Sequence, residues 1–307
     1  MRVFVTGASG HLASAVIPDL IGAGHQVTGL ARSDSSAAAV AALGAEVRRG
    51  DLDDLDGLRE AAAGAEGVIH LAFKHEAMRT GGFAEAVEAD RLALEAMGAA
   101  LAESGSGKPL VIASGTLMLP LGGITGRPGT EDDAAESGPR IDTENAVIAL
   151  AERGVRSSAV RLPPLVHSDL DHHGFTPALI GFARAKGYVG YPGDGANRWP
   201  AGHTLDAARV FRLALEKAPA GSRLHAVGDE GIPLREIAEA IARNLDLPVK
   251  SVPVEEVPEY FAFLAVFIGI DNPTTSARTR ELLDWEPTHP GLIADLDAGH
   301  YFAPQAP

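Results

Sequence analysis

The chain has 307 residues, of which 46% are hydrophobic and 22% charged, and such a chain buries a core without cross-links. It contains no cysteine, which excludes disulfides, thiolate metal sites and a cysteine nucleophile. Its net charge of −15, from 41 acidic and 26 basic residues, opposes binding to nucleic acid and to anionic lipid. No signal peptide or run of about 20 apolar residues is visible, so we expect a soluble cytoplasmic protein.

Apolar runs alternate with helical patterns from the N-terminus onward. Strands are predicted at residues 2–6, 26–30, 45–48, 67–71, 109–113 and 155–162. Helices are predicted between them at residues 12–23, 35–43, 55–63, 83–102 and 142–152. Strands separated by such helices indicate an α/β fold, a doubly wound parallel sheet of the Rossmann type with right-handed crossovers.

The pattern changes after residue 163. Helices are predicted at residues 176–186, 206–217, 234–244 and 257–268, with short extended pieces between them. We therefore expect a dinucleotide-binding domain over residues 1–163 and a smaller, mostly helical C-terminal substrate lobe over residues 164–307. Parts of 198–228 are expected to return to the first domain. The segment 116–140, rich in Gly, Pro and acidic residues, is predicted to be a long functional loop.

A glycine loop, Thr6-Gly-Ala-Ser-Gly-His-Leu-Ala13, joins the first strand to the first helix. Gly7 permits a tight turn, and Gly10 lets the backbone approach a pyrophosphate at the helix N-terminus. Since glycine turns are common, a purely structural turn is the alternative. The strand–loop–helix context favours a dinucleotide site, for which we predict contacts from Gly7, Ser9, Gly10, His11 and Leu12.

The second predicted strand ends at Leu30-Ala-Arg-Ser33. A protein that binds NAD usually places a carboxylate here, on the ribose 2′-hydroxyl. Arg32 and Ser33 suit a 2′-phosphate instead, although Asp34 follows directly and Arg32 could be a solvated loop residue. We predict that the cofactor is NADP(H), with NAD(H) less favoured.

Several segments together resemble the short-chain dehydrogenase/reductase superfamily, in its extended branch of NAD-dependent epimerase/dehydratase-like proteins. The order and spacing of these segments carry the resemblance: the glycine loop, Gly50-Asp51-Leu52, Val68-Ile-His-Leu-Ala72, Arg161-Leu-Pro-Pro-Leu-Val-His167, His203-Thr-Leu-Asp206 and Thr279-Arg-Glu-Leu-Leu-Asp-Trp285. The resemblance implies that the cofactor site also includes Asp51, Leu52, Leu71, Ala72 and Pro163.

The chain departs from this family at the catalytic tyrosine. The family uses a Ser or Thr with a Tyr-x-x-x-Lys pair, and the four tyrosines here, at positions 188, 191, 260 and 301, all lie outside the first domain. By the family spacing, Glu144 puts Arg140 at the lysine position and Glu136 at the tyrosine position. The chain therefore looks like the atypical subgroups that keep the cofactor fold and lose the tyrosine.

Other polar residues at predicted strand ends are candidates for the chemistry. Ser114 and Thr116 follow the fifth strand and could bind a substrate oxygen or nitrogen, or could cap the strand end. Arg140 could hold the nicotinamide ribose, as the family lysine would, or lie at a helix start on the surface. Lys74 and His75 follow the fourth strand, where either could act near the nicotinamide or belong to an exposed loop. Asp171-His172-His173 lacks ligand spacing, so no metal is predicted.

The expected activity is NADP(H)-dependent reduction of a small, fairly apolar carbonyl, imine or activated C=C substrate. A non-catalytic NADP(H)-binding redox sensor is the alternative that the missing tyrosine supports, and an epimerase or isomerase with bound cofactor is a third. The only expected partner besides the small-molecule substrate is a second copy, in a homodimer built on the helices at 83–102 and 142–152, as the resemblance implies.

Overall fold

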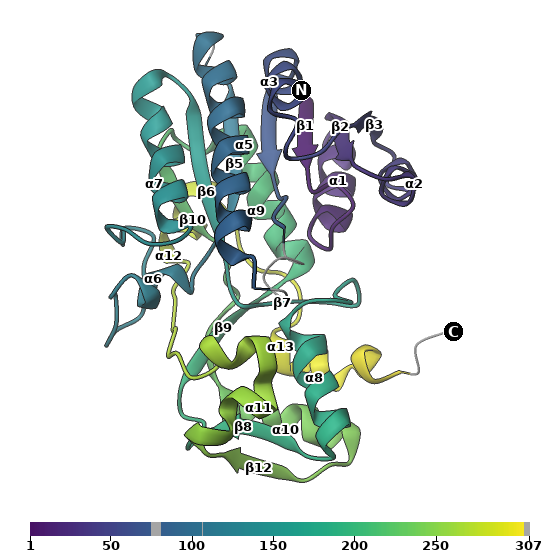
Figure 1. Cartoon of the computed structure of the whole chain (residues 1–307), viewed down its shortest axis with the longest axis vertical. Helices are drawn as coiled ribbons and strands as arrows, with labels where there is room; N and C mark the ends of the chain where they lie inside the picture. The colour runs from purple at the N-terminus through teal and green to yellow at the C-terminus, as the bar shows by residue number, and fades with distance from the viewer. Residues whose placement is uncertain (75–80, 106, 304–307) are drawn as a thin grey trace.

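A seven-stranded parallel sheet forms the larger of two lobes (Figure 1). The computed structural model describes residues 1–74, 81–105 and 107–303. The strand order is β10-β6-β5-β4-β1-β2-β3, and every neighbouring pair is parallel. The strands are β1 (Arg2–Thr6), β2 (Gln26–Ala31), β3 (Glu46–Arg49), β4 (Gly67–His70), β5 (Pro109–Gly115), β6 (Arg156–Leu162) and β10 (Ser222–His225).

Helices cover both faces of this sheet. One face packs against α1 (Ala13–Gly22), α2 (Asp34–Ala42) and α9 (Thr204–Lys217). The other packs against α3 (Leu55–Gly64), α5 (Phe83–Glu103) and α7 (Ile141–Ala149). The predicted doubly wound fold is thus confirmed. After β3 the chain crosses to the other side of β1, so the strand order reverses between β1 and β4, where such sheets bind ligands.

The smaller lobe combines helices with two small sheets (Figure 1). The sheet β11-β9-β7 contains β7 (Leu165–His167), β9 (Arg198–His203) and β11 (Asp229–Pro233), and the other pairs β8 (Val189–Pro192) with β12 (Val249–Val252). The helices after β6, apart from α9, are α8 (Phe175–Lys186), α10 (Leu234–Leu245), α11 (Val257–Phe261), α12 (Ala277–Leu283) and α13 (Leu292–Asp297). No helix in the described part of the chain is long and apolar enough to cross a membrane.

Three predicted segments differ in the structure. The predicted helix 257–268 stops with α11, because Ala262 adopts a left-handed φ of 47° and a 3-10 helix, η3 (Ala262–Val266), follows. This turn buries both Phe261 and Leu264, and that packing outweighs the local cost of the left-handed residue. The helix predicted at 142–152 ends in a 3-10 turn, η1 (Leu150–Arg153). The predicted loop 116–140 contains a short helix, α6 (Met118–Leu121).

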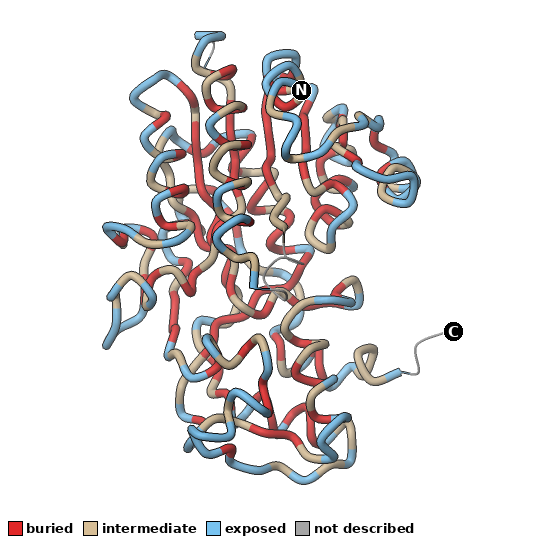
Figure 2. Tube along the Cα trace, in the orientation of Figure 1, coloured by how far each residue is buried: buried red, intermediate tan, exposed pale blue. Residues whose placement is uncertain are grey.

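The C-terminal part of the chain returns to the nucleotide lobe. β10 adds to the edge of the large sheet beside β6, and α12 packs against α9 and β10. Trp285, just after α12, is 1% exposed in the core that α1 and α9 share, and its indole Nε1 donates to the Asp206 carbonyl at 3.2 Å. Figure 2 shows the buried residues following the strands of the sheet. The first lobe is therefore completed by residues far along the chain.

Truncation of this indole tests that packing. We expect Trp285→Ala to lower the free energy of unfolding by roughly 3–5 kcal/mol, because it leaves a large cavity and removes a hydrogen bond. The midpoint of urea unfolding measures the change. The control is Leu205→Ala on α9, whose side chain is exposed and whose loss should cost about 0.5 kcal/mol or less. Equal losses in the two variants would contradict the packing role.

Candidate functional site

The glycine loop passes directly against the end of β4. Gly7 has φ 65°, and a Cβ there would lie 2.6 Å from the backbone nitrogen of Ala72, so only glycine fits. The amide of Gly10 donates to the Gly7 carbonyl at 2.9 Å and closes the turn. Leu12, at the N-cap of α1, offers no side-chain cap, and the amides of Leu12 and Ala13 have no acceptor among the described residues. These amides and the helix dipole form a site for an anion.

Two arginines lie at the ends of β2 and β3. Arg32 is exposed and has no polar partner within the described residues. Arg49 pairs with Ala31 in the strand register; its Nη1 donates to the Ser33 carbonyl, and its Nη2 contacts Asp34 Oδ1 at 2.5 Å. Asp34, which seemed to oppose a phosphate, is therefore ion-paired. Sequence reasoning missed Arg49, although its place at the end of the strand next to β2 was a usable signal.

The loops after β3 and β4 are joined by an ion pair. Lys74 Nζ donates to both carboxylate oxygens of Asp53 at 2.7 Å. The amide of Asp53 in turn donates to Asp51 Oδ1 at 2.7 Å. These contacts engage the Lys74 ammonium with the loop that follows β3. His75, the other candidate in this segment, lies outside the described residues.

Arg140 is held at the ends of β4 and β5. It has a left-handed φ of 64° at the N-cap of α7, and its Nη2 donates to the Ala113 carbonyl at 3.0 Å. Its guanidinium carbon lies 4.2 Å from the centre of the Phe73 ring and its Nη2 3.9 Å from Asp90 Oδ2. Burial lowers the pKa of Arg140, but a guanidinium keeps its charge at neutral pH.

A buried chain of polar groups fixes the carboxylate beside Arg140. The other Asp90 oxygen lies 3.0 Å from His70 Nε2, and His70 Nδ1 lies 2.8 Å from Thr6 Oγ1. Thr6 Oγ1 also accepts a bond from the amide of Ala72 at 3.4 Å. Leu71 and Ala72, predicted to line the cofactor, thus lie where β1 and β4 end side by side.

The two predicted hydroxyls are enclosed. Ser114 is 8% exposed and donates its proton to Glu144 Oε2 at 2.5 Å. Thr116 is 0% exposed, and its Oγ1 accepts a bond from Asn272 Nδ2 at 2.9 Å. In this arrangement Ser114 has no proton for a ligand and Thr116 has no accessible surface. Both partners are distant in sequence, which is why the strand-end position alone pointed to substrate contact.

The carboxylate of Glu144 is the centre of a buried polar cluster. It accepts bonds from Ser114, from Arg161 Nη2 at 2.6 Å and from Arg223 Nε at 3.0 Å. Burial alone would raise the pKa of Glu144, but the hydrogen bonds and charge of Arg161 lower it below its ordinary value. Arg161, from the predicted Arg-x-Pro segment, therefore forms its ion pair with Glu144. Pro163, from the same segment, is buried just beyond the end of β6.

His11 joins the glycine loop to the second lobe. Its Nε2 lies 3.0 Å from Thr204 Oγ1, at the start of α9, and its Nδ1 lies 3.7 Å from Asp171 Oδ1, after β7. Asp171 is buried and also accepts a bond from the Tyr301 hydroxyl at 3.2 Å. Burial is the main cause of the lowered pKa of His11 and of the raised pKa of Asp171.

A second histidine group lies where β9 meets α9. His203 accepts the bond of the Leu205 amide as the N-cap and stacks on His289 at 4.5 Å between ring centres, and His289 Nδ1 lies 2.9 Å from Asp206 Oδ1. Ligand atoms of these three side chains lie within 4.8 Å of one another. However, lone pairs of two stacked, nearly parallel imidazoles lie in separate planes and do not converge on one ion. We assign no metal to this group.

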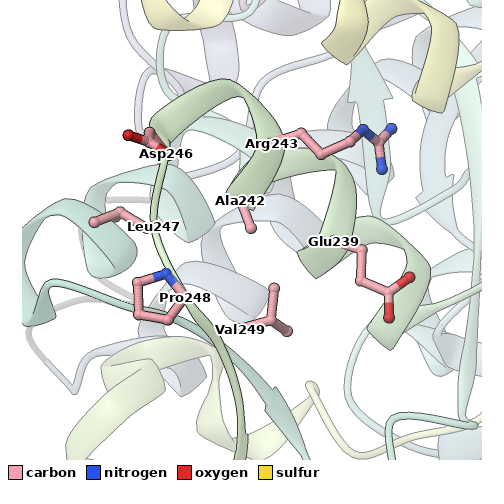
Figure 3. Close-up of a pocket in the computed structure, with 7 residues that line it drawn as sticks. All are labelled: Glu239, Ala242, Arg243, Asp246, Leu247, Pro248 and Val249. Atoms are coloured by element: carbon pink, nitrogen blue, oxygen red, sulfur yellow. The ribbon is translucent and has the colours of Figure 1, made fainter.

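An open hollow in the second lobe lies far from these residues. It is lined by residues of α10 and the turn into β12: Glu239, Ala242, Arg243, Asp246, Leu247, Pro248 and Val249 (Figure 3). Arg243, its only lining cation, is paired with Asp297. Since α10 and β12 lie at the opposite end of the molecule from β1 (Figure 1), we do not take the hollow as the catalytic site.

Comparisons with known proteins agree with this geometry. A profile described as "NAD dependent epimerase/dehydratase family" matches residues 3–227. An uncharacterised protein of Schizosaccharomyces pombe is 45% identical over 304 residues, which cover 98% of this chain and 100% of that protein. A 4-hydroxy-2-methyl-3-oxo-4-farnesyl-3,4-dihydroquinoline-1-oxide ketoreductase of Stigmatella aurantiaca is 28% identical over 283 residues, covering 88% of this chain and 80% of that one.

A solved structure gives the same fold. It is a double mutant of dTDP-glucose 4,6-dehydratase from Streptomyces venezuelae, with NAD bound. It superposes with a TM-score of 0.76 at 20% identity and covers 98% of this chain and 96% of that one. At this identity the likeness concerns the fold alone.

Neutralising the Glu144 carboxylate tests the buried cluster. We expect Glu144→Gln to lower the free energy of unfolding by about 3–5 kcal/mol, because Arg161 stays buried, and Arg223 half-buried, without a counter-charge. Denaturant unfolding at pH 7 measures this loss. Glu60→Gln removes an exposed partner of Arg48 and should cost about 1 kcal/mol or less. A Glu144→Gln variant as stable as the wild type would show that the cluster is not charge-dependent.

The His203 ring predicts a pH dependence of stability. Burial, together with the charges of His167 and His289, lowers the pKa of His203 to about 4. The unfolded chain therefore binds this proton near pH 6.5 while the folded one does not, and stability falls as the pH drops from 6.5 towards 4. We expect His203→Asn, which keeps an N-cap acceptor, to lose less stability over this range. Unfolding curves at several pH values test it, with the exposed His172→Asn as control; parallel curves for wild type and His203→Asn would contradict it.

Proposed function

Because the chain belongs to the NAD-dependent epimerase/dehydratase family, the extended type of short-chain dehydrogenase/reductase, we propose that it is an NADP(H)-dependent oxidoreductase that reduces a small, fairly apolar carbonyl, imine or activated C=C substrate. Enzymes of this type are nicotinamide-dependent oxidoreductases, epimerases and dehydratases. The chain is therefore an enzyme of a nicotinamide-dependent class. What we propose is its use of the phosphorylated cofactor NADP(H), the direction of its reaction as a reduction, and the class of its substrate.

The observation that best supports NADP(H) as the cofactor is the pair of arginines, Arg32 and Arg49, beside the glycine loop. The amides at the start of α1 would hold the pyrophosphate, and the Arg32 guanidinium would hold a 2′-phosphate, joined by the Ser33 hydroxyl if it turns from its N-cap bond with the Ser36 amide. Arg49 supports this assignment because it already neutralises Asp34, the acidic side chain that would repel the phosphate. When bound, the nicotinamide supplies or accepts a hydride.

Aromatic side chains form part of the core of the second lobe, and what supports an apolar substrate there is the pairing of its cations. The Phe175 ring lies 6.0 Å from Trp199 and 6.1 Å from Phe263, and Phe263 lies 6.2 Å from Phe182. The basic side chains of this lobe are largely engaged in ion pairs, among them Lys186 with Glu259 and Arg198 with Asp271. A sugar nucleotide, whose second pyrophosphate needs free cations, is therefore less favoured than a small apolar compound.

The buried hydroxyl groups of Ser114 and Thr116 favour one alternative function, that of a redox sensor. With Ser114 bonded to Glu144 and Thr116 without accessible surface, the chain could bind NADP(H) and act as a redox sensor. Incubation with NADPH and a panel of ketones, cyclic imines and enones separates the alternatives. Consumption of NADPH with a panel member supports the reductase; tight binding without turnover supports the sensor. Cofactor retained through purification and interconversion of epimers without net oxidation support the epimerase.

Charge reversal at Arg32 tests the cofactor assignment. We expect Arg32→Asp to lower the preference for NADPH over NADH by roughly 10- to 100-fold, because a charge-assisted bond is replaced by repulsion. Arg49→Ala should lower it in the same direction, since it frees Asp34. Dissociation constants of both cofactors, measured by fluorescence titration, give the ratio.

The neighbouring Arg48 provides the control. Arg48 is next to Arg49 on β3 and donates to Glu60 and to the Gly57 carbonyl on α3. Arg48→Ala should leave the cofactor ratio unchanged. An unchanged ratio in Arg32→Asp as well would remove the 2′-phosphate assignment.

A further inference from the structure

The Arg140 guanidinium has unused hydrogen-bond donors at the ligand-binding edge of the sheet. One Nη2 bond goes to the Ala113 carbonyl, and Nε and Nη1 have no acceptor among the described residues. The side chain is 23% exposed and is steadied by the Phe73 ring on one face and by Asp90. A planar fork of free N–H groups on a fixed cation is suited to bind a negatively charged oxygen.

The described hydroxyl and amine groups near this guanidinium have other partners. Ser114 gives its proton to Glu144, Thr116 is fully buried beneath Asn272, and the Lys74 ammonium is bound to Asp53. A guanidinium itself does not release a proton at physiological pH.

The tyrosine hydroxyls in the described chain are engaged elsewhere or lie far away. Tyr260 donates to the Tyr188 carbonyl, and Tyr301 donates to Asp171. Tyr188 directly precedes β8 and Tyr191 lies within it, and β8 pairs with β12 at the far end of the second lobe (Figure 1). Arg140 can therefore hold a developing negative charge on oxygen, while the described hydroxyl, amine and phenol groups supply no proton to it.

We infer that Arg140 is the oxyanion-binding residue of this site and that the substrate class is an α,β-unsaturated carbonyl compound, reduced at its C=C bond. Reduction of a ketone needs a proton on the oxygen that becomes the alcohol. Reduction of an enone gives an enolate, which is far less basic than the alkoxide formed from a ketone, so a cation that binds its oxygen suffices until water protonates the carbon. The inference rests on the proposed function, because it chooses among the substrate classes proposed above.

The step balances with NADPH and water. A hydride adds to the β-carbon of the enone, the C=C electron pair moves to form the enolate, and the Arg140 N–H groups bind its oxygen. A proton from water then adds to the α-carbon, and the saturated carbonyl compound leaves with NADP⁺. The substrate gains two electrons and two hydrogen atoms, and NADPH loses the hydride.

A matched pair of probes tests the inference. The enzyme is incubated with NADPH and either cyclohex-2-enone or cyclohexanone, which differ only in the C=C bond. We expect cyclohexanone as the product from the enone and no cyclohexanol from either probe. With deuterated NADPH, NMR should place deuterium on the β-carbon, and in heavy water on the α-carbon. Formation of cyclohex-2-enol, or reduction of cyclohexanone at a comparable rate, would overturn the inference while leaving the reductase proposal standing.

Variants of Arg140 give a second readout. We expect Arg140→Met to lower kcat/KM for cyclohex-2-enone by about 10²- to 10³-fold, as loss of an oxyanion donor does. Arg140→Lys, which keeps a cation, should recover part of this loss. Arg59→Met on α3, an exposed arginine paired with Glu103, is the control and should match the wild type.

Binding of a phenolate tests the interaction of the Arg140 guanidinium with a negatively charged oxygen in the absence of any reaction. 4-Nitrophenol mimics an enolate when ionised, and its absorbance reports its charge. We expect the NADP⁺-loaded wild type to favour the phenolate and Arg140→Met to lose at least tenfold in phenolate affinity. Equal affinity in the two proteins would overturn the role of Arg140. Failure of the wild type to bind NADP(H) at all would instead refute the proposed function, and the inference with it.

Discussion

The carboxylate of Glu144 accepts hydrogen bonds from Ser114 on β5, Arg161 on β6 and Arg223 on β10. One buried group on α7 thus ties together three neighbouring strands near the carboxyl ends of β5 and β6, where the sheet binds ligands. Arg140 precedes Glu144 by one helical turn, and its carbonyl accepts the Glu144 amide at 2.9 Å. The contact that closes off Ser114 therefore also sets the start of α7, and with it the position of the guanidinium. A buried ion pair often adds little to the net stability of a fold. The role of this one is to fix the positions of the side chains and strands around Glu144.

Local patterns in the sequence were sufficient to predict the strands and helices of the first lobe and the use of Gly7, because these depend on nearest neighbours and on backbone sterics. The family resemblance is confirmed, since it rests on motifs whose spacing the fold preserves. The partners of the polar side chains were not predictable: Ser114 meets Glu144 and Thr116 meets Asn272 across 30 and 156 residues. The break at Ala262 was missed for a related reason, because burial of Phe261 and Leu264 overrides a helical pattern that the local sequence supports.

Charge along the glycine-loop edge explains how a chain with a net charge of −15 can hold an anionic cofactor. Two carboxylates near this edge have a cation of their own: Asp34 is paired with Arg49 and Asp53 with Lys74, while Asp51 accepts a bond from the Asp53 amide. Arg32 has no such partner among the described residues and keeps its charge for a ligand. The local potential is then set by free amides, one guanidinium and these ion pairs rather than by the total charge, because charges more than about 10 Å away are largely screened at 0.1 M salt.

His11 of the glycine loop contacts two later segments, Thr204 at the start of α9 and Asp171 after β7. The loop that would hold a pyrophosphate is therefore also bonded to the start of α9 and to the segment after β7. The first 163 residues of the chain contain no tyrosine, so the family's catalytic tyrosine has no counterpart there. A tyrosine would both bind the reacting oxygen and protonate it, and the fixed guanidinium of Arg140 can do only the first of these. The chemistry that we infer, in which Arg140 stabilises charge at oxygen and water protonates carbon, rests on that division of roles.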